Sequence, residues 1–332
     1  AYVGDARIDC PGWERRVSRW PTARPPARIL WEQVAQPVAV RRDRLDLLHA
    51  PVYVGPWDCP CPLVVTVHDL SFFLYPELFR RGNRLYLQAF TRSTVKRAAR
   101  VIADSESTRR DILRLLDVPD ERVVVIPAGV GEQMRPIDDP QALEALRTRH
   151  QLPERMILFV GTLEPRKNLP LLLEAFAQLR RQGCEHTLVI AGGKGWYYDD
   201  IASVVMRLGL EQAVRFPGFV PDAELPLWYN AAELFVYPSL YEGFGLPPLE
   251  AMACGTPVVT SDAASLPEVV GDAGLVVKAH DASALASAMQ QALSDTDLRT
   301  RLRAAGLERA RHFSWRATAT KTAALYHDTL GG

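Results

Sequence analysis

The sequence predicts an α/β protein with two parallel sheets, each in a domain of its own. Short, almost continuously apolar segments such as 63–67 (LVVTV) and 156–160 (MILFV) alternate with segments of helical spacing. Strands that are apolar on both faces are typical of parallel sheets covered by helices on each side. A stretch rich in Pro, Gly and acidic residues at about 128–140 separates two such series. Because the chain has 332 residues, it is long enough for two domains of this kind.

The first domain is expected over residues 1–135. We expect its helices over 27–40, within 76–100 and over 108–116, with Ser107 as the N-cap of the last. The helix within 76–100 has a basic face, which indicates either a solvated surface over a core stripe or a contact with an anionic membrane. Strands of the first sheet are expected at 45–50, 63–67, 101–103 and 123–126.

The second domain is expected over residues 136–314, followed by a C-terminal helical segment at 315–332. Its strands are expected at 156–160, 187–190, 234–237, 257–260 and 274–277. Its helices are expected at 141–150, 169–182, 199–209, 222–231, 249–254, 281–294 and 296–311.

The stretch at 235–262 carries the clearest chemical signal, because it reads as a strand, a tight loop, a helix and a strand. Gly243 and Gly245 let the backbone approach a ligand closely, and N–H groups that open a helix form an anion site. Glu242 in the loop and Glu250 on the helix can each accept hydrogen bonds from two neighbouring hydroxyls. The loop therefore suits a sugar nucleotide. Taken alone, it also fits a buried turn with two solvated glutamates.

Two motifs resemble the retaining glycosyltransferases of family 4: FVGTLEPRKNLPLLLEAF at 159–176 and YEGFGLPPLEAMACGTPVVTSD at 241–262. The resemblance extends from roughly His49 to the C-terminus. It implies the GT-B fold, in which two Rossmann-like domains face a cleft. Members usually begin with a strand, a glycine-rich loop and a helix that this sequence lacks, so we expect a first domain that is incomplete at its N-terminus. The last helix commonly crosses back onto the first domain, and we expect 315–330 to do so.

The resemblance assigns the phosphate and sugar contacts of the donor to loops of the second domain. Arg166 and Lys167 would contact the diphosphate, where negative charge develops as the nucleotide leaves. Many relatives place Arg directly after Gly161, where this chain has Thr162, so Arg166 compensates or diphosphate binding differs. The donor sugar and phosphates would also be bound by Glu242 and by the backbone N–H groups of Gly243, Phe244, Gly245 and Leu246.

The same resemblance assigns the nucleoside contacts. Glu250 would bind the ribose hydroxyls. Gly192 and Gly193, in a loop that continues to Gly195, would let the chain pass close to the nucleoside. The base would be read by the backbone of Gly218, Phe219 and Val220.

His68 follows the predicted strand 63–67 and resembles the histidine beside the reacting centre of the donor sugar. Asp69 would orient His68 or contact the sugar or acceptor. No nucleophile for a double displacement stands out, so the resemblance implies front-face departure, in which the leaving phosphate takes the proton of the acceptor. No DxD-type metal signal accompanies the diphosphate loop, and we expect neither a metal nor another cofactor.

EPRKN resembles the subset of bacterial mannosyltransferases in polysaccharide assembly. The resemblance therefore implies a retaining transferase that moves a hexose, foremost mannose from GDP-mannose, to a saccharide or lipid-linked acceptor in polysaccharide or glycan biosynthesis. A UDP-hexose or another nucleotide sugar remains open as the donor. Further alternatives are a non-catalytic donor-binding fragment and a sugar-nucleotide 2-epimerase. Such epimerases share the fold but lack EGFGLPPLE together with EPRKN.

Charge and cysteine content bear on partners and compartment. The formal net charge is zero, so we expect no nucleic-acid partner. The five cysteines are scattered, as in proteins of a reducing cytoplasm: Cys10, Cys59, Cys61, Cys184 and Cys254. The sequence holds no apolar run of about 18 residues. We therefore expect a cytoplasmic enzyme that contacts the inner face of the membrane at most peripherally.

Overall fold

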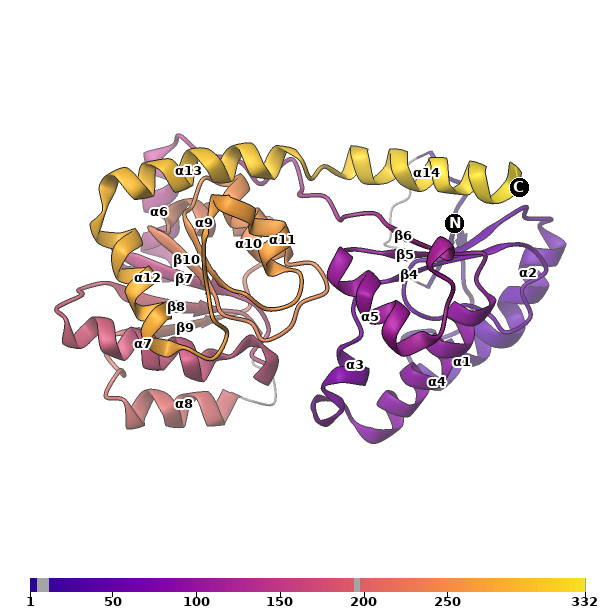
Figure 1. Cartoon of the computed structure of the whole chain (residues 1–332), viewed down its shortest axis with the longest axis horizontal. Coiled ribbons are helices and arrows are strands. Elements are labelled where there is room, and N and C mark those ends of the chain that lie inside the picture. The colour runs from indigo at the N-terminus through magenta and orange to yellow at the C-terminus, as the bar shows by residue number, and fades with distance from the viewer. Residues whose placement is uncertain (5–11, 194–197, 332) are drawn as a thin grey trace.

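A computed structural model describes residues 1–4, 12–193 and 198–331 as two α/β halves placed side by side (Figure 1). Cys10 and residues 194–195 of the predicted nucleoside loop lie outside this description. The first half contains a parallel sheet in the order β3-β4-β5-β6. Its strands are β3 (Leu48–Ala50), β4 (Leu63–Val67), β5 (Arg100–Ala103) and β6 (Val123–Val125). A separate parallel pair near the N-terminus joins β1 (Tyr2–Val3) to β2 (Arg16–Val17).

Helices of the first half follow the predicted order, with one correction. The helix expected at 27–40 spans 25–42 as α1 (Pro25–Leu30), a π-helical turn (Trp31–Ala35) and α2 (Gln36–Arg42). The N-cap of α5 is Ser105 and not Ser107, because Ser105 has extended backbone angles and accepts a hydrogen bond from the Thr108 N–H. The remaining helices are α3 (Ser71–Leu74), α4 (Arg81–Arg97) and α5 (Glu106–Leu116), with 3₁₀ turns at Pro76–Leu78 and Asp120–Arg122.

The second half is organised on a six-stranded parallel sheet in the order β12-β11-β10-β7-β8-β9. Every residue of β10 is buried, as expected for a central strand covered on both faces. The strands are β7 (Met156–Val160), β8 (Thr187–Ala191), β9 (Val214–Gly218), β10 (Leu234–Tyr237), β11 (Val258–Ser261) and β12 (Leu275–Val277).

Helices cover both faces of this sheet. The helix expected at 249–254 begins earlier, at Leu246, with Pro247 and Pro248 in its first turn. The helices are α6 (Pro140–His150), α7 (Leu169–Arg181), α8 (Tyr198–Arg207), α9 (Leu225–Ala231), α10 (Leu246–Ala253), α11 (Leu266–Val270), α12 (Ala282–Ser294) and α13 (Thr296–Arg311). Two 3₁₀ turns lie at Pro165–Lys167 and Gly271–Ala273.

The last helix, α14 (Trp315–Gly331), leaves the second half and runs along the first (Figure 1). Leu325 packs in a small buried cluster with Val64 and Ile102 of the first sheet. The Tyr326 hydroxyl lies 2.5 Å from Nδ1 of His49 on β3. The two halves are therefore tied by α14 as well as by the linker, and the loops at the carboxyl ends of the two sheets come together.

The α/β class with two parallel sheets, predicted from the apolar strand pattern, is confirmed. None of the helices in the described part of the chain is both long enough and apolar enough to cross a membrane.

Candidate active site

Three strand ends of the second sheet converge at glycines that the sequence marked as donor-binding. The Gly192 N–H donates to the Gly218 carbonyl over 2.8 Å, and the Gly161 N–H donates to the Ala191 carbonyl over 2.9 Å. A Cβ atom on Gly192 would lie 1.9 Å from the Gly161 carbonyl oxygen, so the spacing of these loops excludes a side chain there. The Val220 side chain is buried. This convergence creates a backbone-lined edge where parallel sheets usually bind ligands.

Phe219 and Gly193 flank this edge. Phe219 is 74% exposed, which leaves its aromatic ring free to meet a ligand. The Leu163 N–H donates weakly to the Gly193 carbonyl over 3.4 Å, which draws the loops after β7 and β8 together. Thr162, the residue where relatives have Arg, lies between Gly161 and Leu163 and is exposed.

A buried charge cluster joins the two sequence motifs. The Lys167 ammonium donates to Oε1 of Glu242 over 2.6 Å, and the Arg166 guanidinium donates to Oε2 of Glu242 over 2.8 Å. Lys167 is 5% exposed and Glu242 is 8% exposed. The structure thus brings together all three of these predicted residues, although 75 positions separate Lys167 from Glu242.

Local structure holds the basic pair in this place. A 3₁₀ turn presents Arg166 and Lys167, and Asn168 then adopts a left-handed conformation that starts α7. The Asn168 side-chain amide donates to the carbonyls of Pro238 and Ala279, which fastens the turn to the ends of β10 and β12. An asparagine suits this position because it tolerates the left-handed region better than most residues.

The charges in this cluster balance. Burial alone would raise the pKa of Glu242, but the positive charges of Lys167 and Arg166 outweigh it and hold that pKa below its ordinary value. Arg166 also pairs with Glu164 over 3.0 Å. Of the three ammonium protons of Lys167, one serves Glu242 and one serves the Tyr237 hydroxyl at 2.5 Å. Among the described residues the Lys167 ammonium has no third hydrogen-bond acceptor, so one of its donors is open to a ligand anion.

The loop at 242–245 is held by hydroxyl groups from both halves. The single proton of the Ser265 hydroxyl is shared between the carbonyls of Glu242 and Phe244, which lie 2.9 and 2.6 Å from its oxygen. From the first half, Ser105 and Thr108 donate to the Gly243 carbonyl over 2.5 and 3.0 Å. The carbonyls of this loop thus point to protein donors, and its conformation is fixed in advance of binding.

Gly243 has a use that the sequence did not reveal. A Cβ atom at this position would lie 1.8 Å from the His68 carbonyl oxygen. Only glycine therefore allows the Glu242 loop to approach the end of β4 so closely. The absence of a side chain at Gly243 is therefore needed for packing between the two halves, in addition to the close approach to a ligand that the sequence suggested.

His68 lies at the carboxyl end of β4, and its backbone carbonyl faces Gly243 in the loop at 242–245. Its Nδ1 atom is 2.7 Å from Oδ2 of Asp104, and its Nε2 atom is 2.8 Å from the Pro51 carbonyl. Both partners are acceptors, so the arrangement favours the doubly protonated ring. The hydrogen bond to Asp104 accordingly raises the pKa of His68.

Asp104, and not Asp69, orients His68, which corrects one of the two roles considered for Asp69. Oδ1 of Asp69 accepts hydrogen bonds from the Ser71 N–H and hydroxyl over 2.9 and 2.7 Å, which engages Asp69 in the turn that precedes α3. A sequence signal for Asp104 existed. It follows β5, the neighbour of β4, and adjacent parallel strands bring their carboxyl ends to one edge.

Tyr241 is a second residue that sequence reasoning missed. Its hydroxyl lies 3.2 Å from the Leu70 N–H and donates to Asp111 over 2.9 Å, both in the first half. It directly precedes Glu242, so it links the charge cluster to the segment that follows His68. Its tilted ring contact with Tyr75 adds to this connection.

Glu250 occupies a separate position on α10. Oε2 accepts a hydrogen bond from the buried Tyr229 hydroxyl over 2.8 Å. Burial raises the pKa of Glu250, and the Tyr229 hydrogen bond opposes that effect. The carboxylate is thereby held by one oxygen, and its other oxygen has no hydrogen bond to the described residues.

Metal ions in proteins are commonly held by His, Cys, Asp and Glu side chains. Among the residues that the structure describes, no group of three or more His, Cys, Asp or Glu side chains is arranged for a metal ion. Metal independence stays a prediction.

Two protein-family profiles match the chain. "Glycosyl transferases group 1" matches residues 144–309, and "Glycosyltransferase Family 4" matches residues 4–133. The O-antigen chain mannosyltransferase B of Escherichia coli is 38% identical over 79% of this chain and 69% of its own length. The serotype-specific mannosyltransferase WbdA of Escherichia coli is 33% identical over 79% of this chain, but this match spans only 33% of that protein.

Solved structures agree with this relationship. Sucrose-phosphate synthase from Thermosynechococcus elongatus superposes with a TM-score of 0.74 at 26% identity, covering 89% of this chain and 76% of that one. WaaG, a glycosyltransferase involved in lipopolysaccharide biosynthesis, superposes with a TM-score of 0.75 at 20% identity, covering 100% and 90%. The chain therefore belongs to the group 1 glycosyltransferases of family 4, and both the GT-B fold and the enzyme class predicted from its motifs are confirmed.

Proposed function

We propose that this enzyme transfers mannose from GDP-mannose to a saccharide or lipid-linked acceptor in polysaccharide assembly, with retention of configuration. The buried Arg166–Glu242–Lys167 cluster at the carboxyl edge of the second sheet carries the proposal, because a departing nucleoside diphosphate needs fixed cations there. The choice of mannose is supported by the two Escherichia coli mannosyltransferases that resemble this chain.

Donor binding is assigned to the second half. The diphosphate would take the free donor of Lys167 and the outer face of Arg166, together with N–H groups at the start of α10. The ribose diol would bind the free oxygen of Glu250. The base would lie against the backbone at 218–220, with Phe219 available for stacking. An Anabaena HepE structure in complex with UDP-glucose has this fold at 24% identity and a TM-score of 0.75.

The reaction follows from this placement. The bond between the anomeric carbon and the diphosphate oxygen breaks as the acceptor oxygen approaches the same face of the sugar. The acceptor proton passes to the departing phosphate oxygen, which yields an α-mannoside and GDP. Arg166 and Lys167 stabilise the charge that grows on the phosphate, and the His68 imidazolium adds a positive charge on the acceptor side. No step requires a metal ion or a protein nucleophile.

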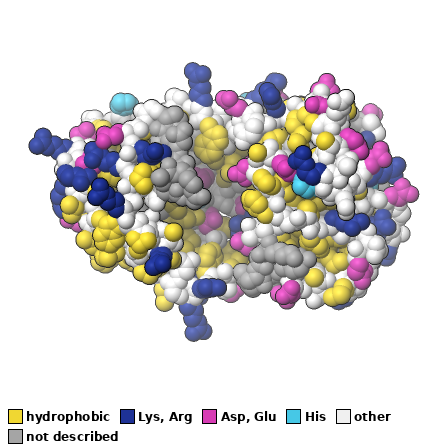
Figure 2. Space-filling model, turned by 180° about the vertical axis from the view of Figure 1, so that it is seen from behind, with side chains coloured by type: hydrophobic (Ala, Val, Ile, Leu, Met, Phe, Trp, Pro, Cys, Tyr) yellow, Lys and Arg dark blue, Asp and Glu magenta, His cyan; other side chains and the backbone are white. Residues whose placement is uncertain are grey.

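The first half would carry the acceptor and a peripheral membrane contact. Exposed basic residues of α4, including Arg81 and Arg92, lie on the same helix as exposed Leu85, and exposed Trp57 stacks on Phe90 of that helix. In Figure 2, basic and hydrophobic side chains gather at the end of the molecule that this half forms. Such a mixture suits anionic lipid headgroups.

The membrane contact is tested by sedimentation with vesicles. Binding to vesicles that contain anionic lipid should exceed binding to neutral vesicles, and it should weaken as salt rises. Leu85→Ser should reduce binding to anionic vesicles. Equal binding to both vesicle types would remove this part of the proposal.

The donor is tested by thermal stabilisation with GDP-, UDP-, ADP- and dTDP-sugars. A ligand that binds only the folded state raises the unfolding midpoint, so GDP-mannose should give the largest shift. Glu250→Gln should reduce that shift, whereas Glu308→Gln, on an exposed part of α13, should not. If UDP-glucose raised the unfolding midpoint more than GDP-mannose does, UDP-glucose would be assigned as the donor in its place.

Turnover separates the remaining alternatives. Incubation with GDP-mannose and an oligosaccharide acceptor should yield an α-linked product by NMR, with activity unchanged by EDTA. A β-linked product would overturn retention. Binding without transfer would support the donor-binding alternative, and an epimerised donor in the absence of acceptor would support the 2-epimerase.

A further inference from the structure

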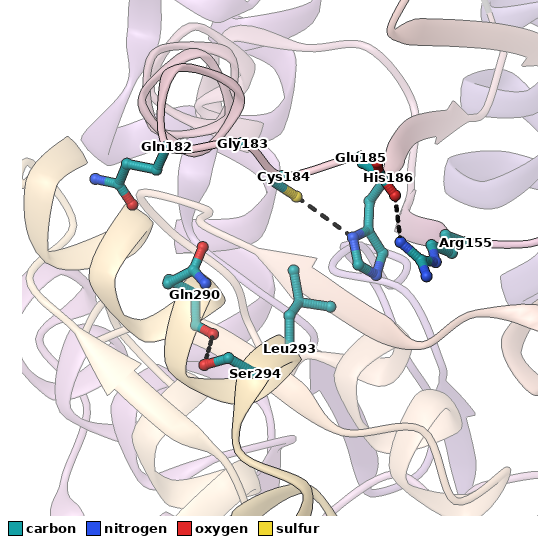
Figure 3. Close-up of a pocket in the computed structure, with 9 residues that line it drawn as sticks. All are labelled: Arg155, Gln182, Gly183, Cys184, Glu185, His186, Gln290, Leu293 and Ser294. Carbon is teal, nitrogen blue, oxygen red and sulfur yellow. Dashed lines mark hydrogen bonds and ion pairs between the residues drawn. The ribbon is translucent and has the colours of Figure 1, made fainter.

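A second charged cluster lies at the opposite edge of the second sheet, where α7 ends and β8 begins. A hollow of about 210 Å³ opens there (Figure 3). Its lining includes Arg155, Gln182, Cys184, His186, Gln290 and Leu293. β8 begins at Thr187, beside this hollow, and ends at the glycines of the donor site. The hollow and the proposed donor site therefore lie at opposite ends of β8.

Cys184, His186 and Glu233 form a hydrogen-bonded chain at the hollow. The Cys184 sulfur lies 3.3 Å from Nδ1 of His186. Nε2 of the same ring lies 3.2 Å from Oε2 of Glu233. The His186 side chain is only 12% exposed, so its ring is held between sulfur and carboxylate. A thiol, an imidazole and an orienting carboxylate in this order are the groups that activate a cysteine nucleophile.

The surrounding charges favour the thiolate. Burial would raise the pKa of Cys184, but the hydrogen bonds from His186 and the nearby positive charges of His186 and Arg180 bring that pKa below its ordinary value. The hydrogen bond with Cys184, together with Glu233, raises the pKa of His186. The other charged pair at the hollow, Arg155 with Glu185, is internally neutral.

The other described cysteines provide a contrast. Cys254 is fully buried. The sulfur atoms of Cys59 and Cys61 lie 3.9 Å apart, and burial together with Cys59 raises the pKa of Cys61 to about 12. Cys184 thus differs from each of these cysteines by its imidazole partner and its open hollow.

We propose that Cys184 is a modification site that reacts with the disulfide of a small thiol, with His186 and Glu233 as its activating pair and the hollow as the space for the incoming group. The Cys184 thiolate attacks one sulfur of the disulfide, a new S–S bond forms and the original S–S bond breaks. The released thiolate takes the proton of the His186 imidazolium. Cys184 is oxidised to a mixed disulfide, and the small disulfide is reduced to one thiol and the bound half.

The proposal is tested with oxidised glutathione as the probe on the full chain. Protein is treated between pH 5 and 9 and digested, and the modified fraction of each cysteine peptide is followed by mass spectrometry. At pH 7, Cys184 should react about tenfold faster than Cys59 or Cys61, because a larger fraction of it is thiolate. The difference is limited to about tenfold because a thiolate of lower pKa is also a weaker nucleophile. The rate for Cys184 should reach half-maximum at a pH below the ordinary pKa of a thiol.

Two variants make the test specific. His186→Gln should slow modification of Cys184 about tenfold at pH 6 and move the midpoint of its pH profile upward, with Cys59 and Cys61 unchanged. Glu233→Gln should give a smaller change in the same direction, and it serves as the test if His186→Gln fails to fold. Modification of Cys184 at the rate of Cys59, or a rate unaffected by both variants, would overturn the proposal.

Discussion

The two halves present their charged groups to the cleft in different ways. In the second half, the Glu242 side chain is 10% exposed and binds both Arg166 and Lys167. In the first half, the His68 side chain is 44% exposed and bonds to Asp104 and to a backbone carbonyl. Charge in the second half is therefore buried and held from several sides, whereas charge in the first half is partly solvated. A desolvated, preorganised group acts more strongly on a developing charge than a solvated one.

The second half should dominate catalysis. The second half holds the groups proposed to stabilise the leaving diphosphate. The first half supplies one cation and the hydroxyls that fix the Gly243 carbonyl. The contact between the halves then positions the loops of the site, and the second half supplies the charge that stabilises the leaving diphosphate. Three substitutions test this division.

The largest effect is expected for Lys167→Met. The change leaves buried Glu242 with one cation and removes a donor from the diphosphate site, so kcat/KM should fall about 10³-fold. The free energy of unfolding should fall by roughly 3 kcal/mol, because part of a buried charge is left uncompensated. Steady-state transfer and chemical denaturation measure the two effects.

A matched lysine provides the control for this change. Lys278 pairs with Asp262, but its side chain is 82% exposed. Lys278→Met should leave activity unchanged and alter the unfolding free energy by less than about 1 kcal/mol. If Lys167→Met kept transfer activity within a few-fold of wild type, the buried charge of the second half would not dominate catalysis.

An intermediate effect is expected for Tyr241→Phe, which removes a hydroxyl shared by Leu70 and Asp111 across the halves. We expect kcat to fall about tenfold, since loosened positioning of the two halves costs about 1–2 kcal/mol. Donor binding, measured by thermal shift, should stay the same because the proposed donor contacts all lie in the second half. A raised donor KM with unchanged kcat would contradict this role.

Tyr75→Phe is the matched control for Tyr241→Phe. The Tyr75 hydroxyl also reaches across the halves, but its contact with the Leu240 carbonyl is long, at 3.4 Å. Such a contact is weak. Its loss should change kcat less than about twofold, and an equal loss in both variants would point to general loosening of the interface.

The smallest effect is expected for Asp104→Asn, measured by pH titration. Asp104 raises the pKa of His68 above the ordinary value of 6.5, so the folded state keeps this proton to a higher pH than the unfolded chain does. The resulting stabilisation is complete below pH 6.5 and is lost as pH rises through the raised pKa. Because His68 is partly exposed, its size should be less than about 1 kcal/mol.

NMR titration of His68 and unfolding at two pH values check this prediction. In Asp104→Asn the pKa of His68 should fall, and the loss of stability between pH 6 and pH 8.5 should shrink. An unchanged His68 titration would show that Asp104 does not set the charge in the first half. Asp104→Asn should keep more transfer activity than Lys167→Met, because the charge in the first half is partly solvated.

Sequence reasoning located most strands well because their apolar runs are nearly continuous, as at Met156–Val160 and Leu234–Tyr237. It was less accurate where short polar side chains compete for one role. Ser105 and Ser107 are both good N-caps by type, and only the extended backbone at Ser105 distinguishes them. Similarly, Asp69 and Asp104 are equally plausible partners of His68 until the local turn engages Asp69 with Ser71.

The sequence by itself determined the fold class and the enzyme family, because apolar periodicity and the two motifs are local properties of the chain. Tertiary structure alone decided that Glu242 holds Lys167 and Arg166, that Tyr241 spans the halves, and that Gly243 lies against His68. These contacts join residues far apart in the chain, and the packing of the two sheets and the loops between them sets their distances. A pattern of residue types cannot specify such distances, since it records which groups are present but not which of them meet.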